Sequence, residues 1–409
     1  MAEIRQIVVL SWIPISRRDA EWLQFDLMEK NGFIVKIFDL SLVLQSQEVL
    51  SVLDSHKTNA KYVHQIESYA QLNEEVKKVV NDSIFIDLLQ GIGEIQWRFE
   101  KVFRILKKHN ARYCVMQTDG YPTLPLTGRQ NWIRFKKVFQ PKALMHFIAR
   151  KIAAPFRKKG FFYPLPVKVF GTRTNRFKAF IDEYEIPEKN ILTLNHPDYY
   201  DWLNYSEQKE EFIKSTDLPP RYCVFVDDAQ THHPDYAIMN LKPLDNAKYL
   251  ASMNKLFRFI ENKTGMPVVI AGHPRPQYDK VLGIFDGRRI IQGKTLALVA
   301  NSELTIVSYS TAASFAVLFN KPLMIVTNDE LLKVGRVGFD EPIARSLGLA
   351  VVNADDDESL NRLNFDFEQW PKTLYQKYIY DWLKFRDDDL PVVQVLINGF
   401  LDMNKEHAN

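Results

Sequence analysis

The sequence predicts an α/β protein of two doubly wound domains, and three observations lead to that prediction. The chain has 409 residues, which is too many for one ordinary core and suits two domains of about 200 residues each. Short apolar runs typical of buried parallel strands alternate with helical periodicity in both halves of the chain. A hydrophobic content of 46% with 25% charged residues indicates well-packed globular domains.

In the first half we expect six buried strands separated by loops and helices. They cover residues 7–10, 33–38, 84–88, 111–116, 167–170 and 191–194. An amphipathic helix ends at Gly32, and residues 91–109 repeat apolar side chains close to the helical period. A polar run ends in a double proline near residue 220, so we place the first domain at residues 1–217.

The second half has a more regular strand-helix rhythm. The expected strands are residues 222–226, 267–271, 289–291, 304–308, a buried strand that ends before Asn328, and residues 348–352. Residues 246–262 carry apolar side chains on one helical face. We therefore predict a second doubly wound domain at residues 218–369. Residues 370–409 are mostly helical and aromatic-rich, and we expect them to pack back on the first domain.

The two cysteines, Cys114 and Cys223, fall inside apolar strand-like runs. This indicates buried free thiols in a reducing compartment, not a disulfide framework. The N-terminal residues have neither the charge order nor the length of a signal peptide. No window approaches 18 uninterrupted apolar residues, so no transmembrane helix is expected. These features predict a cytoplasmic protein.

One segment, residues 127–163, is strongly basic and aromatic. It contains ten Lys and Arg and no Asp or Glu between residues 127 and 160, although the net charge of the whole chain is only +3. Bulky apolar residues interleaved with positive charge are typical of a helix on an anionic membrane surface. A solvated basic face and a nucleic-acid patch are the alternatives. Confinement to one segment of an otherwise acidic chain argues against nucleic acid, and we predict peripheral contact with the inner face of the cytoplasmic membrane.

Four loops follow four predicted strands of the second domain, at residues 227–235, 272–278, 292–295 and 308–314. In a parallel sheet all four emerge at one edge, where ligands bind. Arg275 and Lys294 supply positive charge, and backbone N–H groups and hydroxyls, including Thr295, complete a site suited to a polyanion.

The last of these loops is a hydroxyl-rich turn between a buried strand and a short apolar helix. Its candidate phosphate-binding residues are Ser308, Ser310, Thr311 and Ser314. Unpaired N–H groups at the start of the helix favour an anion there. The alternative is an ordinary strand-helix-strand unit in which the hydroxyls only cap the helix.

Two loops contain His-Pro, at His233 and at His273-Pro274. Proline holds the preceding residue in an extended conformation, which presents the imidazole. We predict that His273 contacts phosphate and that His233 acts as an acid or base; hydrogen-bonded structural histidines are the alternative. Zinc binding is a further alternative for these histidines, but their spacing fits no familiar zinc pattern, and we predict no metal ligands.

Three stretches of the second half carry a recognisable pattern: VFVDDAQTHHPDY, VVIAGHPRPQY and IQGKTLALVANSELTIVSYSTAASFAVLFNKPLMIVT. This pattern resembles bacterial surface-polysaccharide glycosyltransferases of the GT-B architecture, in particular the sialyltransferase-like and Kdo-transferase-like groups. The resemblance implies two Rossmann-like domains facing a central cleft, an N-terminal acceptor-side domain, and a C-terminal domain that binds a nucleotide sugar, commonly CMP-linked. His273 and Pro274 match the His-Pro element of the family. Ser310, Thr311 and Ser314 match its hydroxyl cluster, and Thr295 matches the threonine of the preceding loop.

We therefore predict metal-independent transfer of a sugar from a nucleotide donor to a surface-polysaccharide or lipid-linked glycan, with the donor as co-substrate and no other cofactor. The expected catalytic residues are Asp119, Asp228 and His233, with Asp119 as the base that deprotonates the acceptor hydroxyl. The alternatives are a sugar-nucleotide epimerase of the same fold and a non-catalytic glycan-binding protein.

Overall fold

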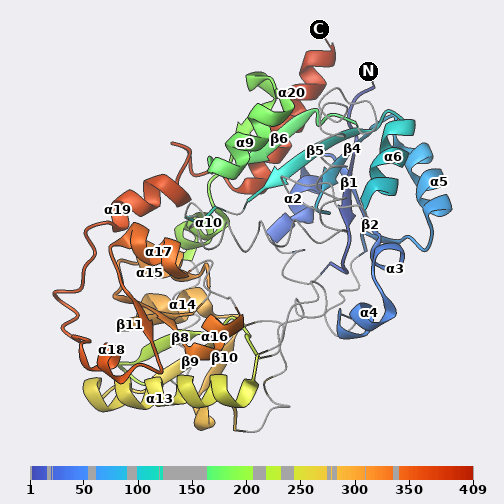
Figure 1. Ribbon diagram of the computed structural model, residues 1–409. Helices are drawn as coiled ribbons and strands as arrows, with labels where there is room; N and C mark the ends of the chain where they lie inside the picture. Colours follow the sequence, from blue (N-terminus) through green and yellow to red (C-terminus); the bar gives the residue numbers. More distant parts are fainter. Residues whose placement is uncertain are drawn as a thin grey trace. The chain divides into compact units, whose positions relative to one another are not determined.

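Two separate parallel sheets organise the chain (Figure 1). The computed structural model describes residues 2–15, 20, 22–53, 61–89, 99–118, 120–122, 164–205, 218–231, 244–273, 278, 283–308, 310–334 and 340–408. Two compact units result. Unit 1 comprises Met1–Asp119, Pro125–Asn195 and Leu390–Asn409, and unit 2 comprises Gly120–Leu124 and His196–Asp389.

Unit 1 contains a seven-stranded parallel sheet in the order β3-β2-β1-β4-β5-β6-β7. Its strands are β1 (Gln6–Ser11), β2 (Ile34–Asp39), β3 (Val63–Gln65), β4 (Ser83–Asp87), β5 (Arg112–Gln117), β6 (Lys168–Gly171) and β7 (Ile191–Thr193). Its helices are α2 (Phe25–Lys30), α3 (Ser41–Leu44), α4 (Gln47–Leu53), α5 (Tyr69–Val79), α6 (Glu100–Lys108), α9 (Asn175–Tyr184), η3 (Glu188–Asn190) and α20 (Val392–Ala408). All six strands expected from the sequence are confirmed. The sequence missed β3, because this three-residue edge strand is polar and only partly buried.

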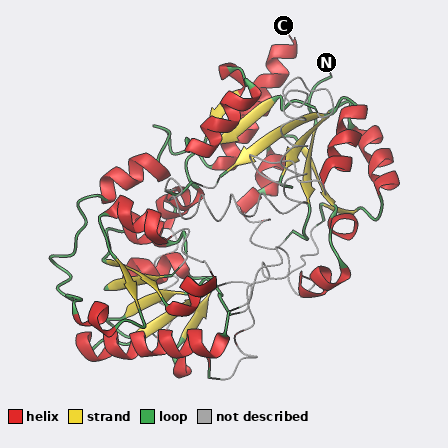
Figure 2. Ribbon diagram, viewed as in Figure 1, coloured by secondary structure: helices red, strands yellow, loops and turns green. Residues whose placement is uncertain are grey.

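Helices cover both faces of this sheet (Figure 2). Of two apolar clusters, one lies on each face. One of them contains α2 and α20, where the ring of Phe400 meets Phe33 and Phe170 edge-on, with centroids 6.3 and 5.7 Å apart. The last helix therefore belongs to the core of unit 1, although it lies almost 200 residues after β7 in the sequence.

Unit 2 contains a six-stranded parallel sheet in the order β10-β9-β8-β11-β12-β13. Its strands are β8 (Cys223–Val226), β9 (Val268–Gly272), β10 (Ile290–Gln292), β11 (Leu304–Val307), β12 (Leu323–Thr327) and β13 (Val351–Asn353). Its helices are α10 (Pro197–Leu203), α13 (Asn246–Thr264), η5 (Ile284–Gly287), α14 (Thr295–Asn301), α15 (Ala313–Leu318), α16 (Asp329–Val334), α17 (Asp340–Leu347), α18 (Asp357–Asn361), α19 (Tyr375–Tyr378) and η6 (Ile379–Leu383). The six expected strands of this half are confirmed.

The longest helix of unit 2, α13, begins and ends where the sequence provides caps. The Asp245 side chain accepts a hydrogen bond from the N–H of Lys248 at 3.2 Å. At the other end Gly265 has φ +69°, the left-handed conformation that glycine adopts without strain.

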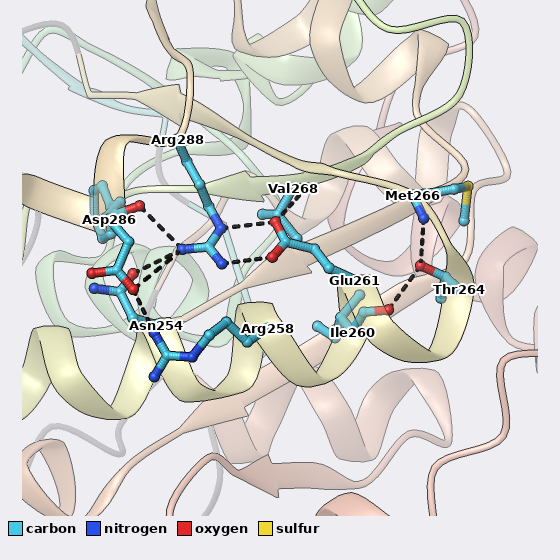
Figure 3. Close-up of polar contacts among 10 residues, drawn as sticks. Asn254, Arg258, Ile260, Glu261, Thr264, Met266, Val268, Asp286 and Arg288 are labelled. Atoms are coloured by element: carbon cyan, nitrogen blue, oxygen red, sulfur yellow. Dashed lines mark hydrogen bonds and ion pairs between the residues drawn. The ribbon is translucent and has the colours of Figure 1, made fainter.

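A polar network fastens the η5 segment to α13 (Figure 3). The Arg288 guanidinium donates to both carboxylate oxygens of Glu261, at 2.8 and 2.6 Å, and to Asn254 Oδ1 at 3.2 Å. One turn away, Arg258 pairs with Asp286 at 2.5 Å. Because the Arg288 side chain is only 10% exposed, this bidentate pair is largely shielded from water and fixes the segment that precedes β10.

The division into two units differs from the predicted domain boundaries. The sequence placed the first boundary after residue 217, whereas the long segment of unit 2 begins at His196. Tyr199 of α10 is buried in the same apolar cluster as Ala316 of α15, so α10 belongs with the second sheet. Of residues 370–409, which we expected on the first domain, α20 lies in unit 1 and the residues up to Asp389 lie in unit 2. Tyr375 of α19 is buried in unit 2, where its hydroxyl donates to Lys321 O at 2.9 Å.

Three further predictions concern the basic segment, membrane spanning and the cysteines. The basic segment 127–163 lies outside the described residues. Among the helices that are described, none is long and apolar enough to cross a membrane. Cys114 and Cys223 are free and buried, as predicted.

Candidate functional site

The candidate site lies at the carboxyl ends of the strands of unit 2. The strand order reverses between β8 and β11: β9 and β10 lie on one side, and β12 and β13 on the other. In open α/β sheets this switch point is where ligands bind. Val226 and Val307 are paired across the switch point, so Asp227 and Ser308 are the first residues beyond it on neighbouring strands.

Asp227 is built into the scaffold of this edge. Its Oδ1 accepts from the Ala229 N–H at 3.1 Å, and its Oδ2 accepts from the Tyr278 hydroxyl. The same hydroxyl accepts from the His273 N–H at 2.9 Å. Burial and the neighbouring Asp227 raise the pKa of Tyr278, which keeps the phenol protonated as a donor. Asp227 and Tyr278 therefore join the ends of β8 and β9.

Asp228 is available for chemistry where Asp227 is not. Gln230 donates to its Oδ2, whereas Oδ1 is buried and has no hydrogen-bond partner within the described structure. Burial first, and then the charges of Asp227 and Asp340, raise its pKa well above the usual value for aspartate. A carboxyl group that holds its proton closer to neutral pH is suited to acid-base catalysis.

His273 is positioned through its main chain. Its N–H contacts Tyr278, and its carbonyl accepts from Gln292 Nε2 at 2.8 Å. The preceding Gly272 allows this, because a Cβ there would lie 2.8 Å from Ile290 Cγ2 and 2.9 Å from the Tyr278 ring. His273 is half-buried at the end of β9, at the predicted edge.

Lys294 and Thr295 follow β10 at the same edge. Gly293, with φ +69°, turns the chain, and Thr295 begins α14. Lys294 is exposed and its side chain does not cap the helix. Two strand spacings separate β10 from β8, which places this loop about 10 Å from the switch point along the sheet.

The hydroxyl-rich turn after β11 divides into three kinds of side chain. Ser308 is fully buried and its Oγ has no partner within the described residues. Ser310 accepts from the Ala312 N–H at 3.3 Å, and Thr311 is exposed. The Ser314 hydroxyl instead contacts Asp198 of α10 and lies 2.9 Å from Thr311 O. In this structure the Ser314 hydroxyl is therefore engaged within unit 2, and its nucleotide role stays a prediction.

Several predicted site residues lie outside the described part of the chain: Asp119, His233, Pro274 and Arg275. Their roles stay predictions. Within the described residues no group of three or more His, Cys, Asp or Glu forms a potential metal site, and metal independence also stays a prediction.

The sequence missed Tyr278, Gln230 and Asp198. Tyr278 ends the loop that contains His273-Pro274, and a lone aromatic residue in a polar loop was its only signal. Asp198 lies more than 100 residues before the Ser314 that it contacts, so no local pattern connects the two.

Searches against protein-family models and curated protein sequences found no match. Among solved structures, a variant of the wall teichoic acid polymerase TagF is similar, with a TM-score of 0.57 and 13% identity over 99% of this chain and 90% of that chain. The same variant soaked with CDPG gives a TM-score of 0.54 at 13% identity and the same coverage. The UDP-GlcNAc 2-epimerase of Methanocaldococcus jannaschii gives 0.48 at 14% identity, over 99% of each chain.

These likenesses concern the fold. Together with the two parallel sheets, the likeness to TagF confirms two Rossmann-like domains of the GT-B type. The sialyltransferase-like or Kdo-transferase-like subgroup is not distinguished by them.

Proposed function

We propose that this protein is a glycosyltransferase that moves a sugar from a nucleotide-sugar donor, with a CMP-linked donor favoured, to a surface-polysaccharide or lipid-linked glycan. One observation carries the proposal: a buried carboxyl group with a raised pKa and an unpartnered oxygen, Asp228, lies across the switch point from the hydroxyl-rich turn. The likeness to TagF, named as a polymerase of a cell-wall polymer, supports polymer-building transfer as chemistry found on this fold.

In the proposed reaction an acceptor hydroxyl attacks the anomeric carbon of the donor sugar. The bond between that carbon and the phosphate oxygen breaks, and the electron pair leaves with the nucleotide. A base, with Asp119 as the proposed group, takes the proton of the acceptor hydroxyl, and Asp228 and His233 are further proposed acid-base groups. His273, Arg275, Lys294, Thr295, Ser310 and Thr311 are the proposed donor-binding residues.

The basic segment 127–163 has a place in this proposal. A lipid-linked acceptor is presented at a membrane, and a basic aromatic segment supplies peripheral attachment to anionic lipid. We propose that the protein acts on the inner face of the cytoplasmic membrane.

A thermal-shift panel tests nucleotide binding. A ligand that binds only the folded state stabilises it by mass action, so we expect CMP to raise the melting temperature more than UDP, GDP or dTDP does. His273→Ala and Thr311→Ala should each remove most of the CMP shift. His64→Ala, which changes an exposed histidine on β3 of unit 1, is the matched control and should retain the shift.

The outcomes separate the alternatives. No shift with any nucleotide contradicts a functional donor site and favours a glycan-binding protein. A UDP-sugar converted to its epimer without an acceptor identifies an epimerase. If both variants keep the full CMP shift, the donor site is not at this edge.

A further inference from the structure

The hydroxyl of Tyr278 extends the pairing of β8 and β9 beyond the ends of the two strands. The strands are parallel, with Val226 opposite Ala271, and the Asp227 N–H donates to the Ala271 carbonyl at 3.0 Å. The next bond of such a ladder would run from the His273 N–H to the Asp227 carbonyl. Here the His273 N–H donates to the Tyr278 hydroxyl at 2.9 Å, and that hydroxyl donates to Asp227 Oδ2. A side chain therefore continues the link between the strands where the candidate site begins.

The chemistry of a phenol suits this position. A hydroxyl has one proton to donate and lone pairs that accept, so it bonds a carboxylate and an N–H at the same time. Tyr278 is 9% exposed, and burial, followed by the charge of Asp227, raises its pKa above the ordinary value of 10.0. A phenol that holds its proton this firmly is unsuited to act as an acid or base near neutral pH. The contribution of Tyr278 is therefore to the geometry of the site.

The main chain of His273 is held on both sides. Its N–H donates to the Tyr278 hydroxyl, and its carbonyl accepts from Gln292 Nε2 at 2.8 Å. The Tyr278 ring also covers the preceding residue, because a Cβ on Gly272 would lie 2.9 Å from Cε2 of this ring. The main-chain conformation of a residue limits the directions that its side chain can take. The position of the His273 imidazole therefore depends on Tyr278 and Gln292.

We propose that Tyr278 and Gln292 are positioning residues for donor binding, which hold the main chain of His273 so that its imidazole meets the phosphate of the nucleotide sugar. This inference rests on the proposed function, because it explains how one donor-binding residue of that site is kept in place. Both residues act through His273 and need no contact with the donor.

Two variants of the full-length protein test the proposal, with CMP as the probe and calorimetry as the measurement. Tyr278→Phe removes the hydroxyl and keeps the ring over Gly272. We expect the Kd for CMP to rise about tenfold, the usual effect of one lost hydrogen bond, and the melting temperature without ligand to fall. Gln292→Ala removes the second bond to His273 from an exposed side chain. Its melting temperature should stay level, and its Kd should rise about three- to fivefold.

Tyr375→Phe is the matched control. Tyr375 is 2% exposed in the same unit, and its hydroxyl donates at 2.9 Å to the carbonyl of Lys321, which precedes β12 at the opposite edge of the sheet. This variant also loses one buried hydrogen bond. It should therefore melt lower than the native protein and bind CMP with the native Kd.

A double-mutant cycle shows whether the effect passes through His273. If Tyr278 acts by placing the imidazole, Tyr278→Phe should raise the Kd no further in a protein that already carries His273→Ala, because no imidazole is left to place. The same holds for Gln292→Ala. An effect that reaches the donor by another route would add in full to that of His273→Ala.

The outcomes separate this proposal from the proposed function. A native protein that binds CMP, with native affinity in both Tyr278→Phe and Gln292→Ala or with additive effects in the cycle, overturns the positioning role alone. If Tyr278→Phe does not fold, Gln292→Ala and its cycle with His273→Ala decide the question. No binding of any nucleotide by the native protein overturns the proposed function, and the positioning role with it.

Discussion

Asp227 and Asp228 are neighbours in the sequence and have different roles in the structure. Both oxygens of Asp227 accept hydrogen bonds, from Ala229 and Tyr278. Asp228 keeps one buried oxygen without a partner in the described structure. At the residue scale, the distinction between scaffold and chemistry therefore depends on which carboxylate is already satisfied, not on residue type.

Replacement of Asp228 by Asn tests this distinction. Because burial and its acidic neighbours raise the pKa of Asp228, the folded protein binds a proton that the unfolded chain has released above its ordinary value of 3.8. The contribution of this proton to the free energy of unfolding is therefore complete below pH 3.8 and is lost as the pH rises through the raised pKa of Asp228. Asp228→Asn should therefore increase stability at neutral pH and flatten its decline from pH 4 upward, whereas kcat should fall about 10²–10⁴-fold.

Urea unfolding between pH 4 and 8, with a donor-turnover assay, measures both effects. Asp245→Asn is the control, since Asn still caps α13 and the pKa of Asp245 is lowered, first by the Lys248 N–H. A loss of stability at pH 7 in Asp228→Asn would contradict the prediction, because it would mean that the Asp228 carboxylate of the native protein is charged and fully hydrogen-bonded.

The sequence located the strand ends at which the candidate residues lie, but not the contacts of those residues. His273 and Ser308 directly follow buried strands and Lys294 follows the partly buried β10, and apolar runs with polar endings indicated these positions. The Tyr278–Asp227 bond and the Asp198–Ser314 contact join positions 51 and 116 residues apart. Contacts of this kind depend on tertiary packing, which no local pattern encodes.

At the scale of elements, the network between α13 and η5 makes a second prediction (Figure 3). Arg288→Met leaves Glu261 without its bidentate partner in a site where the Glu261 side chain is only 27% exposed. The free energy of unfolding should fall by about 2–3 kcal/mol, below the full value for a buried pair because Glu261 is partly hydrated. The free energy of unfolding of Arg288→Lys should lie between those of the native protein and Arg288→Met, because the Lys ammonium cannot donate to both carboxylate oxygens as the guanidinium does.

The control is Arg258→Met, which removes an ion pair whose arginine is 57% exposed. This change should lower the free energy of unfolding by less than about 1 kcal/mol.

The pH dependence of stability gives a further check on the Glu261–Arg288 pair. Burial raises the pKa of Glu261, but hydrogen bonds from Arg288 and the Val268 N–H outweigh it, so the net pKa is lowered from 4.5. This stabilisation is present above pH 4.5 and is lost as pH falls through the lowered pKa. Equal urea midpoints for native protein and Arg288→Met at pH 7 would contradict the prediction.

The boundaries of elements in the structure agree with those expected from the sequence where a cap fixes them. They differ where tertiary packing fixes them. The start of α13 at Asn246 was predicted, and the Asp245 cap explains it. The division of the units differs from the expected boundary, because two prolines at residues 219–220 resemble a linker while the buried Tyr199 packs α10 against the second sheet. Burial of an aromatic side chain outweighs the local signal of a turn.

At the scale of the whole molecule, the proposed membrane role makes its own prediction. Vesicles that contain anionic phosphatidylglycerol should carry the protein upward in a density gradient at low salt, and the bound fraction should fall as salt screens the charges. Replacement of Lys136, Lys137, Lys158 and Lys159 by Gln should abolish flotation. Gln at Lys77, Lys78, Lys107 and Lys108, which end α5 and α6, is a charge-matched control and should not. No flotation of the native protein at low salt would leave the basic segment a solvated surface.

The fold class was predictable at this scale because a doubly wound domain repeats one simple motif. The repeated motif is a strand followed by a helix, and the apolar runs from residue 222 onward show this motif six times. Strand order was not predictable, since β1 and β4, or β8 and β11, become neighbours only through long-range pairing.

The two buried cysteines have a consequence for experiments on how the domains open. Cys114 lies in β5 of unit 1 and Cys223 in β8 of unit 2, and both side chains are fully buried. Burial raises the pKa of Cys223 to about 12 and raises that of Cys114 as well, so neither reacts as a thiolate while its sheet is intact. Each domain thus contains one natural reporter, and the labelling rates at the two positions measure the opening free energy of each domain separately within one intact chain.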